Sequence, residues 1–174
     1  MRSLLLVVSA FLVGCPVRPP VEEDLAPGEG RQDLASADLA VAMPTAFLDL
    51  DTLYQDCMPP VRPDPLLIKG RMTVRNVSGS PLGPVGASEG LILHRDGAQL
   101  ATFRIGPLNL GTIPPHGAVE GRVFDKEAGT LMPARGCQTI PCNEPVRIEI
   151  LLTGGNLPSG SRARSAPYNV ACAF

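Results

Sequence analysis

The 174-residue sequence is short of the residue types on which most catalytic sites depend. It has no tryptophan and only two histidines, His94 and His116. No serine stands in the G-x-S-x-G pattern of a nucleophile elbow, so no Ser-His-acid triad can be assembled from local motifs. Both histidines lie beside turn-forming residues and are expected to face solvent. The sequence therefore predicts a non-catalytic protein with no cofactor.

The chain also lacks a strong charge of either sign. Its formal net charge is −2, which gives no reason to expect a nucleic-acid partner. The acidic residues are unevenly distributed along the chain. Residues 16–44 hold six acidic and two basic residues, a net charge of −4. With four prolines between residues 16 and 27 and few large apolar residues, residues 15–44 are predicted to form a disordered acidic tether.

No apolar run is long enough for a membrane-spanning helix, which needs about 20 residues. The longest, Leu4–Val13, is broken by Ser9 and follows the positive end Met1-Arg2. A positive start, a short apolar segment and a small residue at its end are typical of a secretory signal. Residues 1–14 are therefore predicted to be a signal peptide.

The signal ends in Leu12-Val13-Gly14-Cys15, which resembles the lipobox of bacterial lipoproteins. The resemblance implies cleavage before Cys15, a diacylglycerol on its thiol and a further acyl group, such as palmitate, on the new amine. Two or more acyl chains anchor a protein firmly, whereas one holds it only marginally. Pro16 replaces the Asp that often retains such proteins in the inner membrane, so the outer membrane is expected. The alternative is an ordinary cleaved signal followed by a coincidental cysteine.

Four cysteines remain once Cys15 is assigned to lipid, and an even number in an exported protein predicts two disulfides. The favoured pairing is Cys137–Cys142, which closes a short loop, with Cys57–Cys172, which ties the first strand region to the last. Cys57–Cys137 with Cys142–Cys172 is also open. A zinc site is disfavoured because the tight C-x₂-C pairs of zinc sites are missing, so no metal is expected.

Nineteen prolines and eighteen glycines disfavour long helices and favour short strands joined by turns. Residues 45–174 are predicted to form an all-β domain of about seven strands. Alternating apolar and polar residues indicate strands at Leu48–Asp51, Leu66–Val77, Glu89–His94, Leu100–Ile105, Ala118–Phe124, Val146–Thr153 and Tyr168–Phe174. Asp96-Gly97 predicts a hairpin, whereas residues 106–117, 125–144 and 154–167 are expected to be loops.

Three inward faces follow from the alternation. Val146, Ile148, Ile150 and Leu152 are expected inside, with Arg147, Glu149 and Leu151 outside. Val119 and Val123 are expected to share one side of their strand, opposite Glu120 and Arg122. Tyr168, Val170, Cys172 and Phe174 are expected to share an inward face on the last strand.

Seven short strands in little more than a hundred residues are the signature of an immunoglobulin-like antiparallel β-sandwich. Val74-Arg75-Asn76-Val77-Ser78-Gly79-Ser80-Pro81, the Asp96-Gly97 hairpin and the later Leu110-Gly111 resemble bacterial immunoglobulin-like modules such as the CARDB domains. The resemblance spans residues 66–124 and implies a cell-surface binding module.

Two groups of charged residues are candidate sites. Asp49 and Asp51 share a strand face and could begin a calcium site, but no D-x-D-x-D-G loop follows them. Lys69, Arg71 and Arg75 form a basic stripe that could meet an acidic partner or lipid headgroups. In both cases a solvated sheet face is the expected outcome.

The sequence thus predicts a non-catalytic envelope lipoprotein, held to the membrane through Cys15, whose immunoglobulin-like domain contacts another envelope or surface component. The alternative is a periplasmic lipoprotein that binds a small ligand or an ion.

Overall fold

The computed structural model describes residues 43–154 and 156–174, which form an all-β unit, and the all-β prediction is confirmed. The predicted signal peptide, Cys15 and nearly all of the predicted tether lie outside the described residues. Within the described part, no helix is long and apolar enough to cross a membrane.

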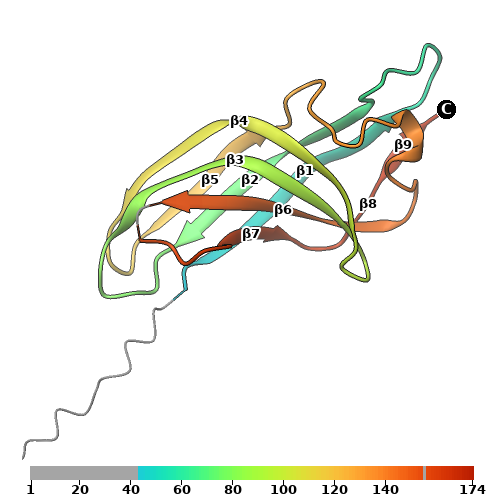
Figure 1. Ribbon diagram of the computed structural model, residues 1–174. Helices are drawn as coiled ribbons and strands as arrows, with labels where there is room; N and C mark the ends of the chain where they lie inside the picture. Colours follow the sequence, from blue (N-terminus) through green and yellow to red (C-terminus); the bar gives the residue numbers. More distant parts are fainter. Residues whose placement is uncertain (1–42, 155) are drawn as a thin grey trace, which may run out of the picture. The chain divides into compact units, whose positions relative to one another are not determined.

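Nine strands form one sheet with the order β4-β3-β6-β7-β1-β2-β5, in which β8 pairs with β6 and β9 with β1. The sheet curls around its apolar face (Figure 1). The strands are β1 Thr45–Asp56, β2 Leu66–Arg75, β3 Leu82–His94, β4 Gln99–Ile113, β5 Ala118–Asp125, β6 Pro145–Gly154, β7 Arg162–Ser165, β8 Tyr168–Asn169 and β9 Ala171–Ala173, and a 3-10 turn, η1, lies at Gly136–Gln138.

The sheet is mixed, so the prediction of purely antiparallel pairing is wrong in one respect. β1 runs parallel to β7, with Phe47 opposite Arg164, and parallel to β9, with Gln55 opposite Cys172. All the other pairs of named strands are antiparallel. Parallel neighbours need a long crossover connection, and the whole domain between β1 and β7 supplies it.

Two phenylalanines fill the middle of the core, each lying across a glycine of the neighbouring strand. Phe103 of β4 faces Gly90 of β3, and Phe124 of β5 faces Gly70 of β2. A Cβ built on Gly90 would stand 2.6 Å from both Cε atoms of Phe103. Aliphatic side chains complete the core, among them Ile68, Met72, Ile92, Ile105, Ile113, Leu131, Ile140, Ile148 and Ile150.

The inward faces agree with the sequence on β6 and disagree on β5 and at the end of the chain. Val146, Ile148, Ile150 and Leu152 are buried as predicted, but Glu149 is buried too. On β5 the buried residue is Phe124, while Val123 is 61% exposed. Of the predicted last strand only Val170 is fully buried, and Phe174 is 81% exposed.

The segment after β2 turns around one buried side chain, Asn76. Its Nδ2 donates to the carbonyls of Ser80, Ile113 and Pro114 at 2.7, 3.2 and 3.0 Å. Its Oδ1 accepts from the amide and the hydroxyl of Ser78 at 2.9 and 2.7 Å. Asn76 therefore joins the β2–β3 turn to the β4–β5 turn.

The Asp96-Gly97 hairpin is confirmed. The amide of His94 donates to the carbonyl of Ala98 at 2.8 Å, and Gly97 has a φ of 88°. This left-handed conformation is one that glycine adopts without the steric cost of a Cβ.

Candidate functional site

Two disulfides lie at the end of the domain where β1 finishes. They join Cys57 to Cys137 and Cys142 to Cys172, with Cα–Cα distances of 5.9 Å in each case. Four half-cystines in two bridges agree with the sequence, but the favoured pairing, Cys137–Cys142 with Cys57–Cys172, is wrong. The β5–β6 loop crosses the ends of β1 and β9 and places one cysteine against each. This arrangement depends on the parallel pairing of β1 with β9. The pairing joins distant parts of the chain, so no pattern in the local sequence predicts it.

We call this region the stapled end: residues 57–65, residues 126–144 and residues 171–174. In Figure 1 the β1–β2 loop, η1 and the C-terminus lie together at the upper right, and β1 begins at the lower left. The amide of Cys57 donates to the carbonyl of Ala173 at 2.9 Å, and that of Gly136 to the carbonyl of Pro63 at 3.2 Å. Backbone hydrogen bonds thus join all three segments in addition to the disulfides.

A fully buried amide, Gln55, lies between the two disulfides. Its Nε2 is 3.2 Å from the carbonyl oxygen of Cys137 and 3.5, 3.8 and 4.0 Å from the sulfurs of Cys57, Cys142 and Cys172. Its Oε1 has no hydrogen-bond partner among the described residues. Sequence reasoning missed Gln55, because a glutamine between Tyr54 and Asp56 looks like an ordinary polar strand residue.

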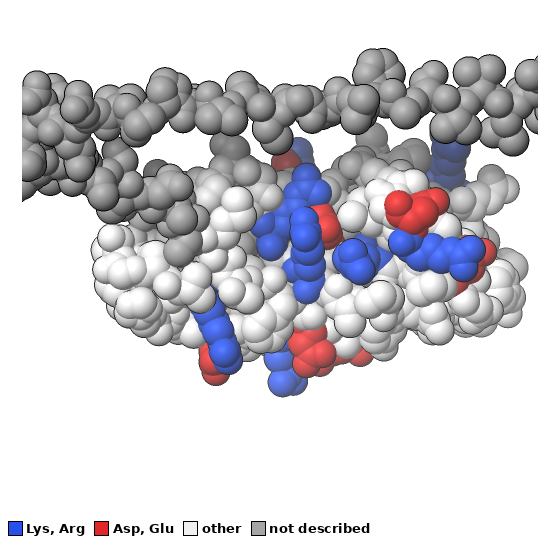
Figure 2. Space-filling view, turned by 90° about the horizontal axis from the view of Figure 1, so that it is seen from below, with Lys and Arg blue, Asp and Glu red and all other residues white. Residues whose placement is uncertain are grey.

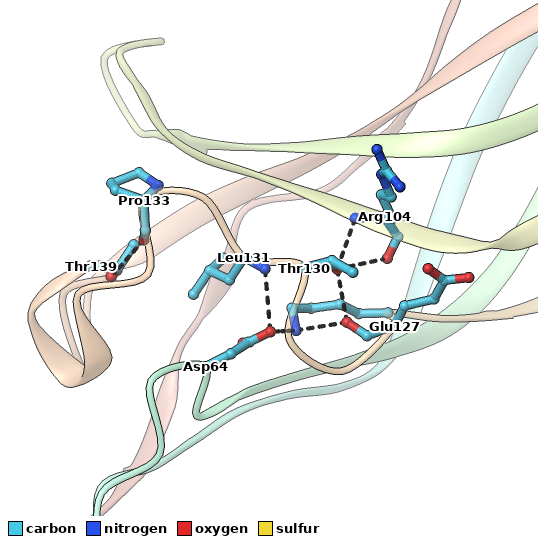
Figure 3. A network of polar contacts seen from close by, with 8 residues as sticks. Asp64, Arg104, Glu127, Thr130, Leu131, Pro133 and Thr139 are labelled. Carbon is cyan, nitrogen blue, oxygen red and sulfur yellow. Dashed lines mark hydrogen bonds and ion pairs between the residues drawn. The ribbon is translucent and has the colours of Figure 1, made fainter.

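An ion pair fixes the first part of the long β5–β6 loop. Lys126 Nζ lies 2.5 Å from Asp64 Oδ2, and the two side chains are only 2% and 6% exposed. The same Oδ2 accepts the amide of Leu131 at 3.2 Å, as Figure 3 shows, and Lys126 also donates to the carbonyl of Glu127 at 3.1 Å. Burying both charges is costly unless they are paired in this way.

Hydroxyl groups continue this network along the loop (Figure 3). Thr130 Oγ1 accepts the amide of Arg104 at 3.0 Å and donates to the carbonyl of Glu127 at 2.8 Å. Thr139 Oγ1 donates to the carbonyl of Pro133 at 3.1 Å. The segment that the sequence predicted as an irregular loop is irregular but well fixed.

The stapled end exposes large apolar side chains. Met58 is 52% exposed, Val61 48% and Phe174 81%. Met58 and Phe174 follow Cys57 and Ala173 in the chain, and these two residues are joined by a backbone hydrogen bond. The stapled end thus presents large apolar side chains to solvent.

The structure brings His94 together with two carboxylates. Its Nδ1 lies 3.0 Å from Asp96 Oδ1, and its Nε2 lies 3.3 Å from Glu144 Oε2. The hydrogen bond with Asp96, and after it that with Glu144, raises the pKa of His94 above its usual 6.5. The amide of Ala98, and after it His94, lowers the pKa of Asp96. No hydroxyl or thiol of the described residues hydrogen-bonds to this imidazole, and His116 lies in a different turn.

The basic stripe is matched by acidic residues of the neighbouring strands. Lys69 pairs with Asp125 at 3.6 Å, Arg71 with Asp51 at 3.6 Å, and Arg75 with Glu120 at 3.2 Å. These side chains are about half exposed, so each pair contributes about 0–1 kcal/mol. Figure 2 shows basic and acidic side chains interspersed on the face viewed from below.

The aspartates considered for calcium take part in this pattern. Asp51 pairs with Arg71, and Asp49 lies opposite Arg71 in the register. Among residues 43–154 and 156–174 no three His, Cys, Asp or Glu side chains are grouped so that they could hold a metal ion.

Comparison with protein-family models, with curated proteins and with solved structures finds no match to this chain.

Proposed function

We propose that this chain is an envelope lipoprotein, anchored through lipid on Cys15, whose immunoglobulin-like domain binds another envelope or surface component without catalysing a reaction. The observation on which the proposal rests is the position of the stapled end. β1 runs for 12 residues from Thr45 to Asp56, about 40 Å at roughly 3.3 Å per residue. A domain held through Thr45 therefore carries its two disulfides, with Met58 and Phe174 exposed beside them, at the far end of β1.

The strand order supports the immunoglobulin-like part of the proposal. β1, β2 and β5 are neighbours, as are the first, second and fifth strands of the immunoglobulin sandwich, and β3, β6 and β7 are neighbours on the other side of β1. The disulfides differ from those of antibody domains, because they lie at one end of the strands rather than between the two sheets.

The fixed conformation of the loops at the stapled end favours binding of a partner. Two disulfides and a buried ion pair hold the stapled end in one arrangement, so a partner pays little ordering entropy on association. Phe174 and Met58 would supply the apolar contacts that dominate interface energetics. The partner is therefore expected to present a complementary apolar surface.

Lipidation is tested by Cys15→Ser in the full chain. Cells fed a fatty-acid analogue should label the unaltered chain and not the variant, and the variant should leave the membrane fraction. Labelling that is unchanged in Cys15→Ser would contradict the anchor.

Partner binding is tested by crosslinking in the intact envelope. Phe174→Ser should remove the crosslinked product, because it deletes the most exposed apolar group of the stapled end. Val123→Ser is the matched control, since Val123 is 61% exposed on β5 and lies outside the stapled end. Equal loss of crosslinking in both variants would contradict the assignment of this surface.

A further inference from the structure

A buried glutamate holds two arginines in place at the opposite end of the sheet. Glu149 of β6 is 3% exposed. Its Oε2 accepts from Arg162 Nη1 at 2.6 Å, and its Oε1 lies 2.9 Å from Arg164 Nε. Both carboxylate oxygens are therefore occupied, and each fixes one guanidinium group.

The two arginines keep most of their hydrogen-bond donors free. Each guanidinium has five N–H groups, and among the described residues Arg162 and Arg164 pair only with Glu149. Arg162 is 33% exposed and Arg164 63%. Because they are two residues apart on β7, they project to the same face about 7 Å apart at their Cα atoms.

Both arginines line a pocket of about 410 Å³ between the start of β1 and the β6–β7 loop. Ser159, Gly160 and Ser161 form part of its wall, and none of the described residues that line it is acidic. Arg162, Arg164 and the Glu149 beneath them together have a net charge of +1. The pocket is thus a positive site whose donors are oriented before any ligand arrives.

We propose that this pocket binds a phosphate group through Arg162 and Arg164. Arginine binds carboxylate and phosphate through paired, planar N–H groups. A carboxylate has only two acceptor oxygens, whereas inorganic phosphate has four, so phosphate can accept from more of the donors that Glu149 leaves free on the two arginines. Each arginine uses one donor to pair with Glu149, and this pairing orients its remaining donors. Less side-chain entropy is then lost when a ligand binds. The phosphate could belong to a lipid headgroup or to a soluble phosphate compound, and the pocket recognises the same group in both.

The test uses the full chain with Cys15→Ser, so that any association with vesicles reports the protein surface rather than an anchor. Inorganic phosphate is titrated at low ionic strength while the side-chain Nε–H NMR signals of Arg162 and Arg164 are followed. Both signals are expected to shift on one saturable curve. Arg164→Gln should weaken binding roughly tenfold, the usual loss for a hydrogen bond to a charged group.

Arg71→Gln is the matched control. Arg71 is 59% exposed and paired with a carboxylate, like Arg164, but it does not line the pocket. It should change phosphate affinity less than twofold. Urea unfolding of both variants checks that the fold persists, which is expected for Arg164→Gln because Glu149 keeps Arg162.

Vesicles distinguish the two sources of phosphate. Association with phosphatidylglycerol vesicles that is lost in Arg164→Gln and kept in Arg71→Gln would identify a lipid headgroup. Phosphate binding without vesicle association would identify a soluble phosphate compound. The inference is overturned if neither phosphate nor phosphatidylglycerol binds, or if Arg71→Gln weakens binding as much as Arg164→Gln does.

Discussion

Gly90→Ala tests the way in which the core is filled. Gly90 is buried on β3 opposite Phe103, which is only 2% exposed. A Cβ at Gly90 would meet the Cε1 and Cε2 atoms of Phe103 at 2.6 Å and the Cζ closer still. Favourable carbon–carbon contacts need about 3.5–4.0 Å, so the whole ring has to move by about 1 Å within a packed core.

The expected cost follows from two opposing effects. Overpacking a core destabilises by about 1–3 kcal/mol, occasionally more. Replacing glycine by alanine in a strand returns about 0.5–1 kcal/mol. Because three ring atoms clash at once, the overpacking cost should lie at or above the top of its range. We expect a net loss of about 2–3 kcal/mol, which lowers the Tm by roughly 8 °C for a domain of this size.

Urea unfolding followed by circular dichroism measures this loss. Gly106→Ala is the control, because a Cβ at Gly106 of β4 would meet no atom within 4 Å, and its effect should stay within about 0.5 kcal/mol. Adding Phe103→Leu to Gly90→Ala should recover part of the loss, seen as a coupling energy in a double-mutant cycle. A Gly90→Ala variant as stable as the Gly106→Ala control would refute the reasoning.

The remaining predictions concern the two disulfides and His94. Tryptic digestion without reduction should give one species in which peptide 136–147 is joined to both the Cys57 peptide and the Cys172 peptide; a separate peptide 136–147 would contradict the pairing. Removing the Cys57–Cys137 bridge, whose sequence separation is 80, should lower the free energy of unfolding by about 4.5 kcal/mol. Removing the Cys142–Cys172 bridge, whose separation is 30, should lower it by about 3.6 kcal/mol. Because the pKa of His94 is raised in the folded protein, protonation of His94 stabilises the fold. This stabilisation is complete below the unfolded pKa of about 6.5 and is lost as the pH rises through the folded pKa. An NMR titration should show that Glu144→Gln lowers this pKa; an unchanged pKa would contradict the contact.

Local alternation was enough to predict the strands whose two faces differ. Val146–Leu152 reads as a strand with one apolar face, and the structure has β6 there. The second half of β4 could not be found in this way, because Gly106, Pro107 and Gly111 look like loop residues. That segment is held instead by its pairing with β3, in which Leu108 lies opposite Ala87.

The details of the candidate sites depend on contacts between distant segments. Glu149 fits the polar face of β6, and only the arrival of Arg162 and Arg164 from β7 makes its burial possible. Asp64 and Lys126 are 62 residues apart and belong to loops that have no pattern of their own. The disulfide pairing is of the same kind, since it depends on which strand lies beside β1.

The Cys57–Cys137 bridge also determines how the domain would respond to a pull. A load applied at Thr45 and resisted by a partner on the β5–β6 loop passes along β1 and then through the disulfide. Residues 58–136 are bypassed by this covalent path and bear none of the load. β1 is already extended and can lengthen very little. Under tension the domain would therefore act as a short inextensible link, and any elastic response would have to come from outside it.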